Sequence, residues 1–313
     1  MSSTLSAQNR ASRTAYDCAA VRAAMHAWSG CKEMDYLAIE LFDGSAASMR
    51  ARLGVALIKV GLVRLTRFIV SRTSKGVDIL LFARQAVPDD MIRKALAENP
   101  DTQVVLLGAG LDTSGLRIGA QRRAANAFPG AFFEVDLPAM QAEKRRAIAQ
   151  LLRSRPALSE DNIVYVPCSF GENELGKSLR SAGYDVHKPT IWIWSGVIHY
   201  LTEDAVHATV NQLRQLSAPG SQLFFDFILL EAYQNPHAFG FAKLKARFDS
   251  FGEVMSFGFR QGEEHVRSWL SEHGLTLVRS YTSADMVDLY EKATGQRAPS
   301  KGTAWSSLCV ARI

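Results

Sequence analysis

The pattern of apolar and polar positions divides the chain into two parts. Up to about residue 80, apolar residues recur at spacings of three and four, most clearly over 49–70, and this periodicity predicts amphipathic helices. From Val104 onward, short apolar runs alternate with helical stretches, which predicts an α/β fold with a mostly parallel sheet. The expected strands are 104–108, 131–136, 162–167, 190–196, 221–228, 275–281 and 306–313, the last two closing the sheet as an antiparallel hairpin.

The same change of pattern suggests the domain organisation. We expect an N-terminal helical region and flap over residues 1–85 and an α/β domain over 86–313. The segment at about 231–260 is rich in phenylalanine, glycine and charge, and it is expected to be an inserted cap. The flap and the phenylalanines of the cap would line a ligand pocket or form a lid that excludes water.

Composition narrows the class of protein. The 313 residues are 47% hydrophobic and 21% charged, as in ordinary globular proteins. No uncharged apolar run reaches the roughly 18 residues of a membrane span, and residues 1–12 lack the apolar core of a signal peptide. The four cysteines form neither a C-x-x-C pair nor a Cys/His zinc spacing. We therefore expect a cytoplasmic protein with free thiols, no membrane span and no metal site.

The net charge of +5 is mild, but part of it is clustered. No acidic residue occurs between Asp43 and Asp78. Few aromatic residues are interleaved there to stack on bases, which favours a basic flap or a homodimer face over a nucleic-acid or membrane surface. The basic residues of this interval are Arg50, Arg52, Lys59, Arg64, Arg67, Arg72 and Lys75.

The first strand runs into a glycine turn, VVLLGAGLDT. In an open α/β sheet, ligands bind beyond the carboxyl ends of the strands, and Gly108 and Gly110 would let the backbone turn tightly and a ligand approach closely. The third glycine of the dinucleotide pattern G-x-G-x-x-G is absent, because Thr113 stands there. Alone, the turn fits either a ligand cradle or a plain strand-to-helix connection.

The second strand, AFFEVD, adds an acidic residue. A carboxylate at the end of this strand accepts hydrogen bonds from ribose hydroxyls. Asp136 at the strand end is favoured for this role over Glu134, which lies two residues earlier on the same face. The turn and the acid together predict an adenosine-containing cofactor.

Three segments, LLGAGLDTSGLRI, FFEVDLPAMQAEKRR and WSGVIHYLTEDAV, carry a more specific resemblance. In this order and spacing, the chain resembles the leucine carboxyl methyltransferase and polyketide O-methyltransferase family of class I S-adenosylmethionine enzymes. The resemblance implies a Rossmann-like fold with a seven-stranded sheet. It also implies that Arg72 pairs with the cofactor carboxylate and that Asp136 holds the ribose. The implied cofactor-binding positions are Arg72, Gly108, Gly110, Asp112, Asp136, Leu137, Ser169, Phe170 and Ser195.

Two positions depart from the family pattern. Ser169 and Phe170 stand where the family usually has Asp-Leu next to the adenine. Ser195 stands where the family motif E-G-x-x-x-Y-L begins with glutamate, so a negative charge is missing from a site that would bind a sulfonium and an amine. These two departures leave two reactions open.

The favoured reaction is methyl transfer to the oxygen of a small carboxylate or phenol in secondary metabolism. This in-line displacement depends mainly on positioning and needs no metal. Within the motif, Tyr200 would present its ring to the sulfonium. His199 is either a weak base or a packed histidine. Ser195, His199 and Tyr200 are the candidate catalytic residues, and the partner is a small-molecule acceptor without nucleic acid.

The alternative reaction consumes S-adenosylmethionine alone. Loss of a nearby carboxylate lowers the pKa of the cofactor's α-amine, and a neutral amine is a nucleophile. Attack of that amine on the γ-carbon would give azetidine-2-carboxylate and methylthioadenosine. A cofactor-binding protein that has lost activity is the third hypothesis.

Overall fold

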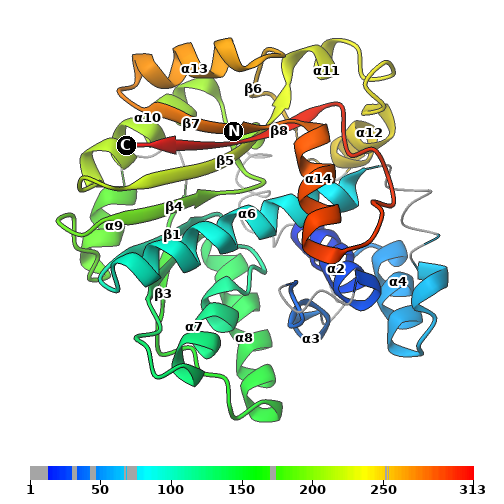
Figure 1. Cartoon of the computed structure of the whole chain (residues 1–313), viewed down its shortest axis with the longest axis horizontal. Helices are drawn as coiled ribbons and strands as arrows, with labels where there is room; N and C mark the ends of the chain where they lie inside the picture. The colour runs from blue at the N-terminus through cyan, green and yellow to red at the C-terminus, as the bar shows by residue number, and fades with distance from the viewer. Residues whose placement is uncertain are drawn as a thin grey trace.

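A mixed sheet forms the centre of the structure, with strand order β3-β2-β1-β4-β5-β8-β7 and a short β6 that pairs with β5 (Figure 1). The computed structural model describes residues 13–29, 34–42, 47–66, 68, 76–169, 174–250, 252 and 254–313. All pairings are parallel except those of β8 with β5 and β7. The strands are β1 Gln103–Leu107, β2 Ala131–Asp136, β3 Ile163–Pro167, β4 Thr190–Trp194, β5 Gln222–Leu229, β6 Gly258–Phe259, β7 Thr276–Tyr281 and β8 Ser306–Arg312.

The predicted α/β fold with a mostly parallel sheet is confirmed. Strands β1 and β4 are buried along their whole length, which explains why both are continuous apolar runs in the sequence. The two closing strands pair antiparallel as predicted, but helix α14 connects them in place of a tight turn. The two-residue β6 was not predicted, because so short a strand leaves no periodic signal.

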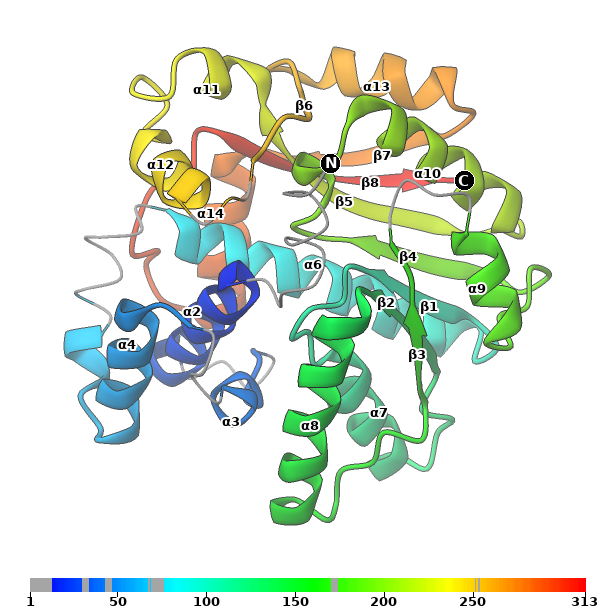
Figure 2. The ribbon, with the colours of Figure 1, turned by 180° about the vertical axis from the view of Figure 1, so that it is seen from behind.

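Helices cover both faces of the sheet. Helices α6 and α14 lie in front of the sheet in Figure 1, and α10 lies in front of it in the reverse view of Figure 2. The helices are α2 Arg13–Ser29, α3 Ala38–Leu41, α4 Met49–Lys59, α6 Val77–Glu98, α7 Ser114–Ala124, α8 Pro138–Ser154, α9 Leu175–Ser181, η1 Ile198–Tyr200, α10 Glu203–Leu216, α11 Leu230–Gln234, α12 Ala242–Ser250, α13 Glu263–Glu272 and α14 Ser283–Thr294.

The helical region expected over residues 1–85 reaches into the α/β part through α6. This helix crosses residue 85 and contacts both α2 and β4. A domain boundary at that residue would therefore divide a continuous helix, and the division stays a prediction. The expected cap segment, 231–260, contains most of α11, all of α12 and β6. Its Phe241 and Phe259 are buried in the main core, so neither side chain lines an open pocket.

Helix α2 is fastened by segments that come much later in the chain. The carboxylate of Asp17 pairs with the Arg247 guanidinium of α12 at 2.5 Å, and the same Arg247 nitrogen donates to Ser48 Oγ at 2.9 Å. At the other end of α2, the Gln296 side-chain amide donates to the Ser29 carbonyl at 2.9 Å. These contacts hold α2 and the start of α4 against the α/β part.

Candidate active site at the carboxyl edge of the sheet

The glycine turn after β1 is tied to the end of β2 by backbone hydrogen bonds. Gly108 and Gly110 both have positive φ, +74° and +47°, which glycine adopts without the steric cost of a Cβ atom. The Gly108 and Ala109 amides donate to the Val135 carbonyl at 2.8 and 3.0 Å. The Gly110 amide donates to the Asp136 carboxylate at 2.6 Å. The turn and the β2 acid therefore form one rigid unit.

Two other elements approach this turn closely. A Cβ atom at Gly108 would overlap Cγ2 of Val197, which follows β4. A Cβ atom at Gly110 would lie 3.6 Å from the Ala15 Cβ of α2. The turn is thus enclosed by α2 on one side and by the β4 end on the other.

Asp136 keeps both carboxylate oxygens oriented. One oxygen accepts from Gly110, and the other accepts from the Leu137 amide at 2.7 Å. Burial raises the pKa of Asp136, and the two backbone donors oppose that shift. Each carboxylate oxygen has a second lone pair, so the group can still accept a bond from a ligand hydroxyl.

Glu134, the competing acid on β2, lies in a different environment. Its carboxylate pairs with the Lys144 ammonium of α8 at 2.6 Å, and both side chains are buried. Burial raises the pKa of Glu134 to about 7, while the Lys144 charge opposes that shift. Glu134 is therefore committed to an internal ion pair, whereas Asp136 lies at the strand end.

Asp112, two residues after Gly110, lies just before α7, whose N-cap is Thr113. Its carboxylate accepts from the Ser114 amide at 2.7 Å and from the Ser114 hydroxyl at 2.5 Å. Burial would raise its pKa, but the positive charges of Lys144 and Arg22 outweigh burial, and the pKa is lowered. Asp112 therefore stays ionised at the helix N-terminus, where a negative charge is favourable.

A buried charge network, which was not predicted from the sequence, includes Thr113 and Arg117, just after the turn. The Arg117 guanidinium binds both Asp89 carboxylate oxygens, at 2.7 and 3.2 Å, and donates to Thr113 Oγ1 at 2.8 Å. The same Thr113 hydroxyl donates to Asp35 at 2.5 Å, and Asp35 in turn accepts from Arg22 of α2 at 3.0 Å. This network joins α2, α6 and α7.

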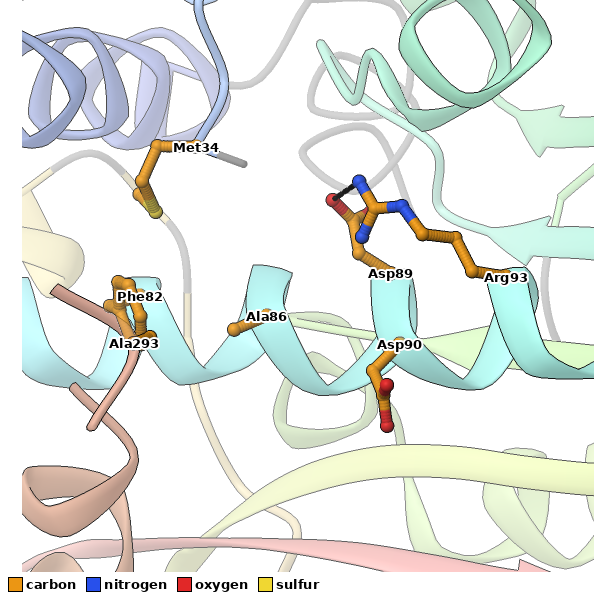
Figure 3. Close-up of a pocket in the computed structure, with 7 residues that line it drawn as sticks. All are labelled: Met34, Phe82, Ala86, Asp89, Asp90, Arg93 and Ala293. Atoms are coloured by element: carbon orange, nitrogen blue, oxygen red, sulfur yellow. Dashed lines mark ion pairs between the residues drawn. The ribbon is translucent and has the colours of Figure 1, made fainter. Parts of the chain in front are cut away.

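Asp89 also borders a pocket of about 120 Å³ on the α6 surface (Figure 3). There the Arg93 guanidinium pairs with the Asp89 carboxylate at 3.6 Å. None of the residues lining this pocket comes from the glycine turn or the β2 end. The pocket is therefore separate from the candidate site. Its lining residues are Met34, Phe82, Ala86, Asp89, Asp90, Arg93 and Ala293.

The end of β4 is held by a further internal ion pair, which was also not predicted. Asp226 of β5 is fully buried, pairs with Arg84 of α6, and accepts from the Gly196 amide at 2.5 Å. Gly196 has a φ of +73°, so the chain turns sharply directly after Ser195. The sequence signal for such a pair was the carboxylate of Asp226 inside the apolar run LFFDFI, because a buried charge requires a partner of opposite charge.

The catalytic candidates His199 and Tyr200 lie on η1, just beyond Ser195. His199 is buried, and burial lowers its pKa to about 4, so it is neutral near pH 7. Within the described residues its Nδ1 atom has no hydrogen-bond partner. The two rings lie 4.3 Å apart between centroids. This environment fits a packed neutral histidine as well as it fits a weak base.

A pH dependence follows from the His199 environment. Because the folded-state pKa is about 4 and the unfolded value is about 6.5, the stabilising contribution is complete above pH 6.5 and lost as the pH falls toward 4. We expect wild type to lose about 3 kcal/mol more unfolding free energy than His199→Phe between pH 7 and pH 4. Urea unfolding at several pH values measures this. The control is His187→Phe at an exposed histidine; equal slopes for all three proteins would contradict the assignment.

The strand order brings the sequence-predicted positions to one edge. Ser169 follows β3, and the Cys168 amide beside it donates to the Asp136 carbonyl at 3.0 Å. Because the order is β3-β2-β1-β4, Ser169, Asp136, the glycine turn and Ser195 follow one another along the carboxyl ends of adjacent strands. Arg72 and Phe170, the other two cofactor-binding candidates, lie outside the described residues.

A mostly parallel sheet with one reversed strand, β8, between β5 and β7, together with a glycine turn after β1 and an acid at the end of β2, defines a Rossmann-like class I methyltransferase fold. The chain belongs to the leucine carboxyl methyltransferase family, whose model matches residues 57–214.

The curated proteins that this chain resembles in sequence carry a classification consistent with this family. A protein of Frankia alni, classed as an S-adenosyl-L-methionine-dependent methyltransferase, is 33% identical over 47% of this chain and 47% of its own length. A protein of Mycolicibacterium paratuberculosis with the same classification is 32% identical over 59% of this chain and 58% of its own length. The chain thus spans about half the length of the curated relatives it matches.

Solved structures support the fold. A Thermobifida fusca protein classed as a methyltransferase matches with a TM-score of 0.54 and 16% identity, over 87% of this chain and 91% of its own. A DUF574 family protein from Streptomyces avermitilis matches with a TM-score of 0.54 and 15% identity, over 91% and 99%. Among the helices in the described ranges, none has the length and apolar character needed to cross a bilayer.

Proposed function

We propose that this protein transfers a methyl group from S-adenosylmethionine to an oxygen of a small molecule. The observation that carries the proposal is the hydrogen bond from the Gly110 amide to Asp136, which joins the glycine turn and the β2 acid in one preformed cradle. Membership of the leucine carboxyl methyltransferase family supports it. A carboxylate or phenol acceptor from secondary metabolism is the expected partner. The cytoplasmic location and the homodimer stay predictions.

The residues at the sheet edge fit this cofactor. Gly108 and Gly110 would lie against its methionine part and ribose, where no Cβ atom blocks an approach. The Asp136 carboxylate would accept the ribose hydroxyls, with Leu137 and Ser169 toward the adenine. Arg72 is proposed to pair with the cofactor carboxylate on the strength of the family resemblance.

When bound, S-adenosylmethionine supplies an electrophilic methyl group on a sulfonium. The chain's own contribution is then to position the acceptor oxygen and exclude water. Tyr200 is proposed to present its ring to the sulfonium. Neutral His199 is proposed as the weak base for a phenol acceptor, since its Nδ1, which has no hydrogen-bond partner among the described residues, can accept a proton. A carboxylate acceptor is already ionised and needs no base.

The test is an incubation of purified protein with S-adenosylmethionine, first alone and then with a panel of small carboxylic acids and phenols, followed by mass spectrometry. S-adenosylhomocysteine that appears only with an acceptor, together with a methylated product, is the expected result. Tyr200→Ala is expected to lower the rate at which S-adenosylhomocysteine and the methylated product form. Measurable cofactor binding without turnover under any condition would favour a cofactor-binding protein that has lost activity.

A second candidate function is the ring closure of S-adenosylmethionine. The observation that favours it is the state of the β4 end, where Ser195 carries no charge and the nearby Asp226 is already paired with Arg84. With Ser195 uncharged and Asp226 already paired, neither residue would stabilise the ammonium form, and the pKa of the cofactor's amine would fall. The amine nitrogen would then bond to the γ-carbon as the carbon–sulfur bond breaks, and the electron pair would leave with the sulfur of methylthioadenosine.

The same incubation separates the two reactions. Methylthioadenosine and azetidine-2-carboxylate formed from S-adenosylmethionine alone, above the rate without protein, would establish the cyclase. In that case Ser195→Glu is expected to suppress ring closure by holding the amine protonated. Unchanged ring closure in this variant would show that the missing charge is not the cause.

A further inference from the structure

Helix α4 and the turn of helix after it carry a concentrated set of exposed apolar side chains. Among the described residues, nine large hydrophobic side chains are exposed, and six of them lie between residues 49 and 68. Their exposed fractions run from 44% to 75%. Isolated exposed apolar residues are common, but a set this concentrated marks an interaction site. We call this the α4 surface: Met49, Leu53, Val60, Leu62, Leu65 and Phe68.

The orientation of this surface is fixed by contacts on the other side of α4. Val55 and Ile58 are buried and face the core. Ser48 caps the helix through the Ala51 amide and is itself held by Asp17. The helix therefore cannot turn its exposed stripe inward without breaking this packing. Both ribbon views place α4 at the edge of the molecule, on the outer side of α2 (Figures 1 and 2).

Within the segment that carries the apolar side chains, 49–68, every charged residue is basic. The exposed cations Arg52, Lys59 and Arg64 lie among them, and no acidic residue occurs in the sequence between Asp43 and Asp78. Apolar side chains on one helical face with flanking cations are typical of helices that lie in a membrane interface. We propose that the α4 surface binds an anionic lipid surface.

The charge distribution favours lipid over a second copy of this chain. A two-fold symmetric contact through the α4 surface would bring two copies of the same basic patch together, and residues 49–68 contain no acidic residue to pair with those cations. An anionic bilayer instead offers negative charge to the cations and an apolar interior to the protruding Leu, Val and Phe side chains. The proposal is independent of the reaction at the sheet edge.

The experiment measures binding of the full chain to vesicles. We expect it to co-sediment with equimolar phosphatidylcholine and phosphatidylserine but not with phosphatidylcholine alone, and to be released as salt is raised. Each cation near an anionic lipid surface is expected to strengthen binding about fivefold. The triple variant Arg52→Gln, Lys59→Gln, Arg64→Gln is therefore expected to bind the anionic vesicles roughly a hundredfold more weakly than wild type. Leu53→Ser with Leu65→Ser is expected to weaken binding as well.

The matched control removes three exposed cations elsewhere: Arg153→Gln, Lys177→Gln and Lys292→Gln. This control has the same net charge as the α4 variant and is expected to bind anionic vesicles like wild type. Equal weakening in both triples, or no binding of wild type to anionic vesicles, would overturn the proposal. So would a dimer in analytical ultracentrifugation that the two serine substitutions abolish, without any vesicle binding. Circular dichroism checks that each variant is folded.

Discussion

Replacing Gly108 with alanine is expected to lower the affinity for S-adenosylmethionine about a hundredfold. The residue has a φ of +74°, which is costly for any side chain, and the added Cβ would overlap Val197. Because Val197 follows β4 directly, relief of that overlap would displace the Ser195 turn from the glycine turn. Both halves of the proposed cradle would therefore move. Isothermal titration calorimetry of the variant measures the loss.

The matched control is Gly220→Ala. Gly220 also has a positive φ, +90°, but nothing lies within 4 Å of the Cβ position. This variant carries the backbone strain without the overlap, at a turn before β5. It is expected to lose stability and keep its affinity for the cofactor. Equal affinities of the two variants would show that the close approach at Gly108 has no part in binding.

Replacing Arg117 with methionine is expected to lower the free energy of unfolding by about 3–5 kcal/mol. The substitution leaves the buried Asp89 carboxylate without its bidentate guanidinium partner. It also removes a cation that lies 3.7 Å from the Asp35 carboxylate. Burial already raises the pKa of Asp89 against the effect of Arg117, so loss of Arg117 would raise that pKa further. Urea unfolding at neutral pH measures the loss.

Two further variants distinguish this cause from a general packing defect. The double variant Arg117→Met, Asp89→Leu is expected to recover part of the lost stability, because no unpaired charge remains at Asp89. The control Arg155→Met breaks a two-bond pair with Glu40 of similar geometry but at the surface. It is expected to leave the unfolding midpoint unchanged. A double variant no more stable than Arg117→Met would contradict the charge argument.

The strands were predictable from sequence because buried parallel strands are apolar on both faces. Runs such as VVLL and TIWIW admit few other interpretations once helical stretches separate them. The order of strands then brings Ser169, Asp136, Gly110 and Ser195 to one edge, although each was chosen from a motif. Whether these residues bind the cofactor stays a prediction.

The ion pairs that support this edge were not predictable in the same way. Arg84 and Asp226 are 142 positions apart, and nothing in either segment indicates the other. For α4, the apolar spacing predicted a helix but did not show which side of it faces the core. Its apolar residues form two stripes, one with Val55 and Ile58 and one with Met49 and Leu53, and spacing alone does not show which stripe is buried. Only the packing of α4 against the rest of the molecule determines which stripe is buried.

The fastening of α2 by late segments has a consequence for synthesis on the ribosome. Its partners include Arg247 and Gln296, which follow it by 230 and 267 positions at the bonded residues, so the helix is synthesised long before the residues that hold it. Domains that depend on such distant contacts fold late and expose apolar surface meanwhile. The helix that encloses the glycine turn is thus made well before the segments that secure it, and its apolar side chains have no final packing partners in that interval.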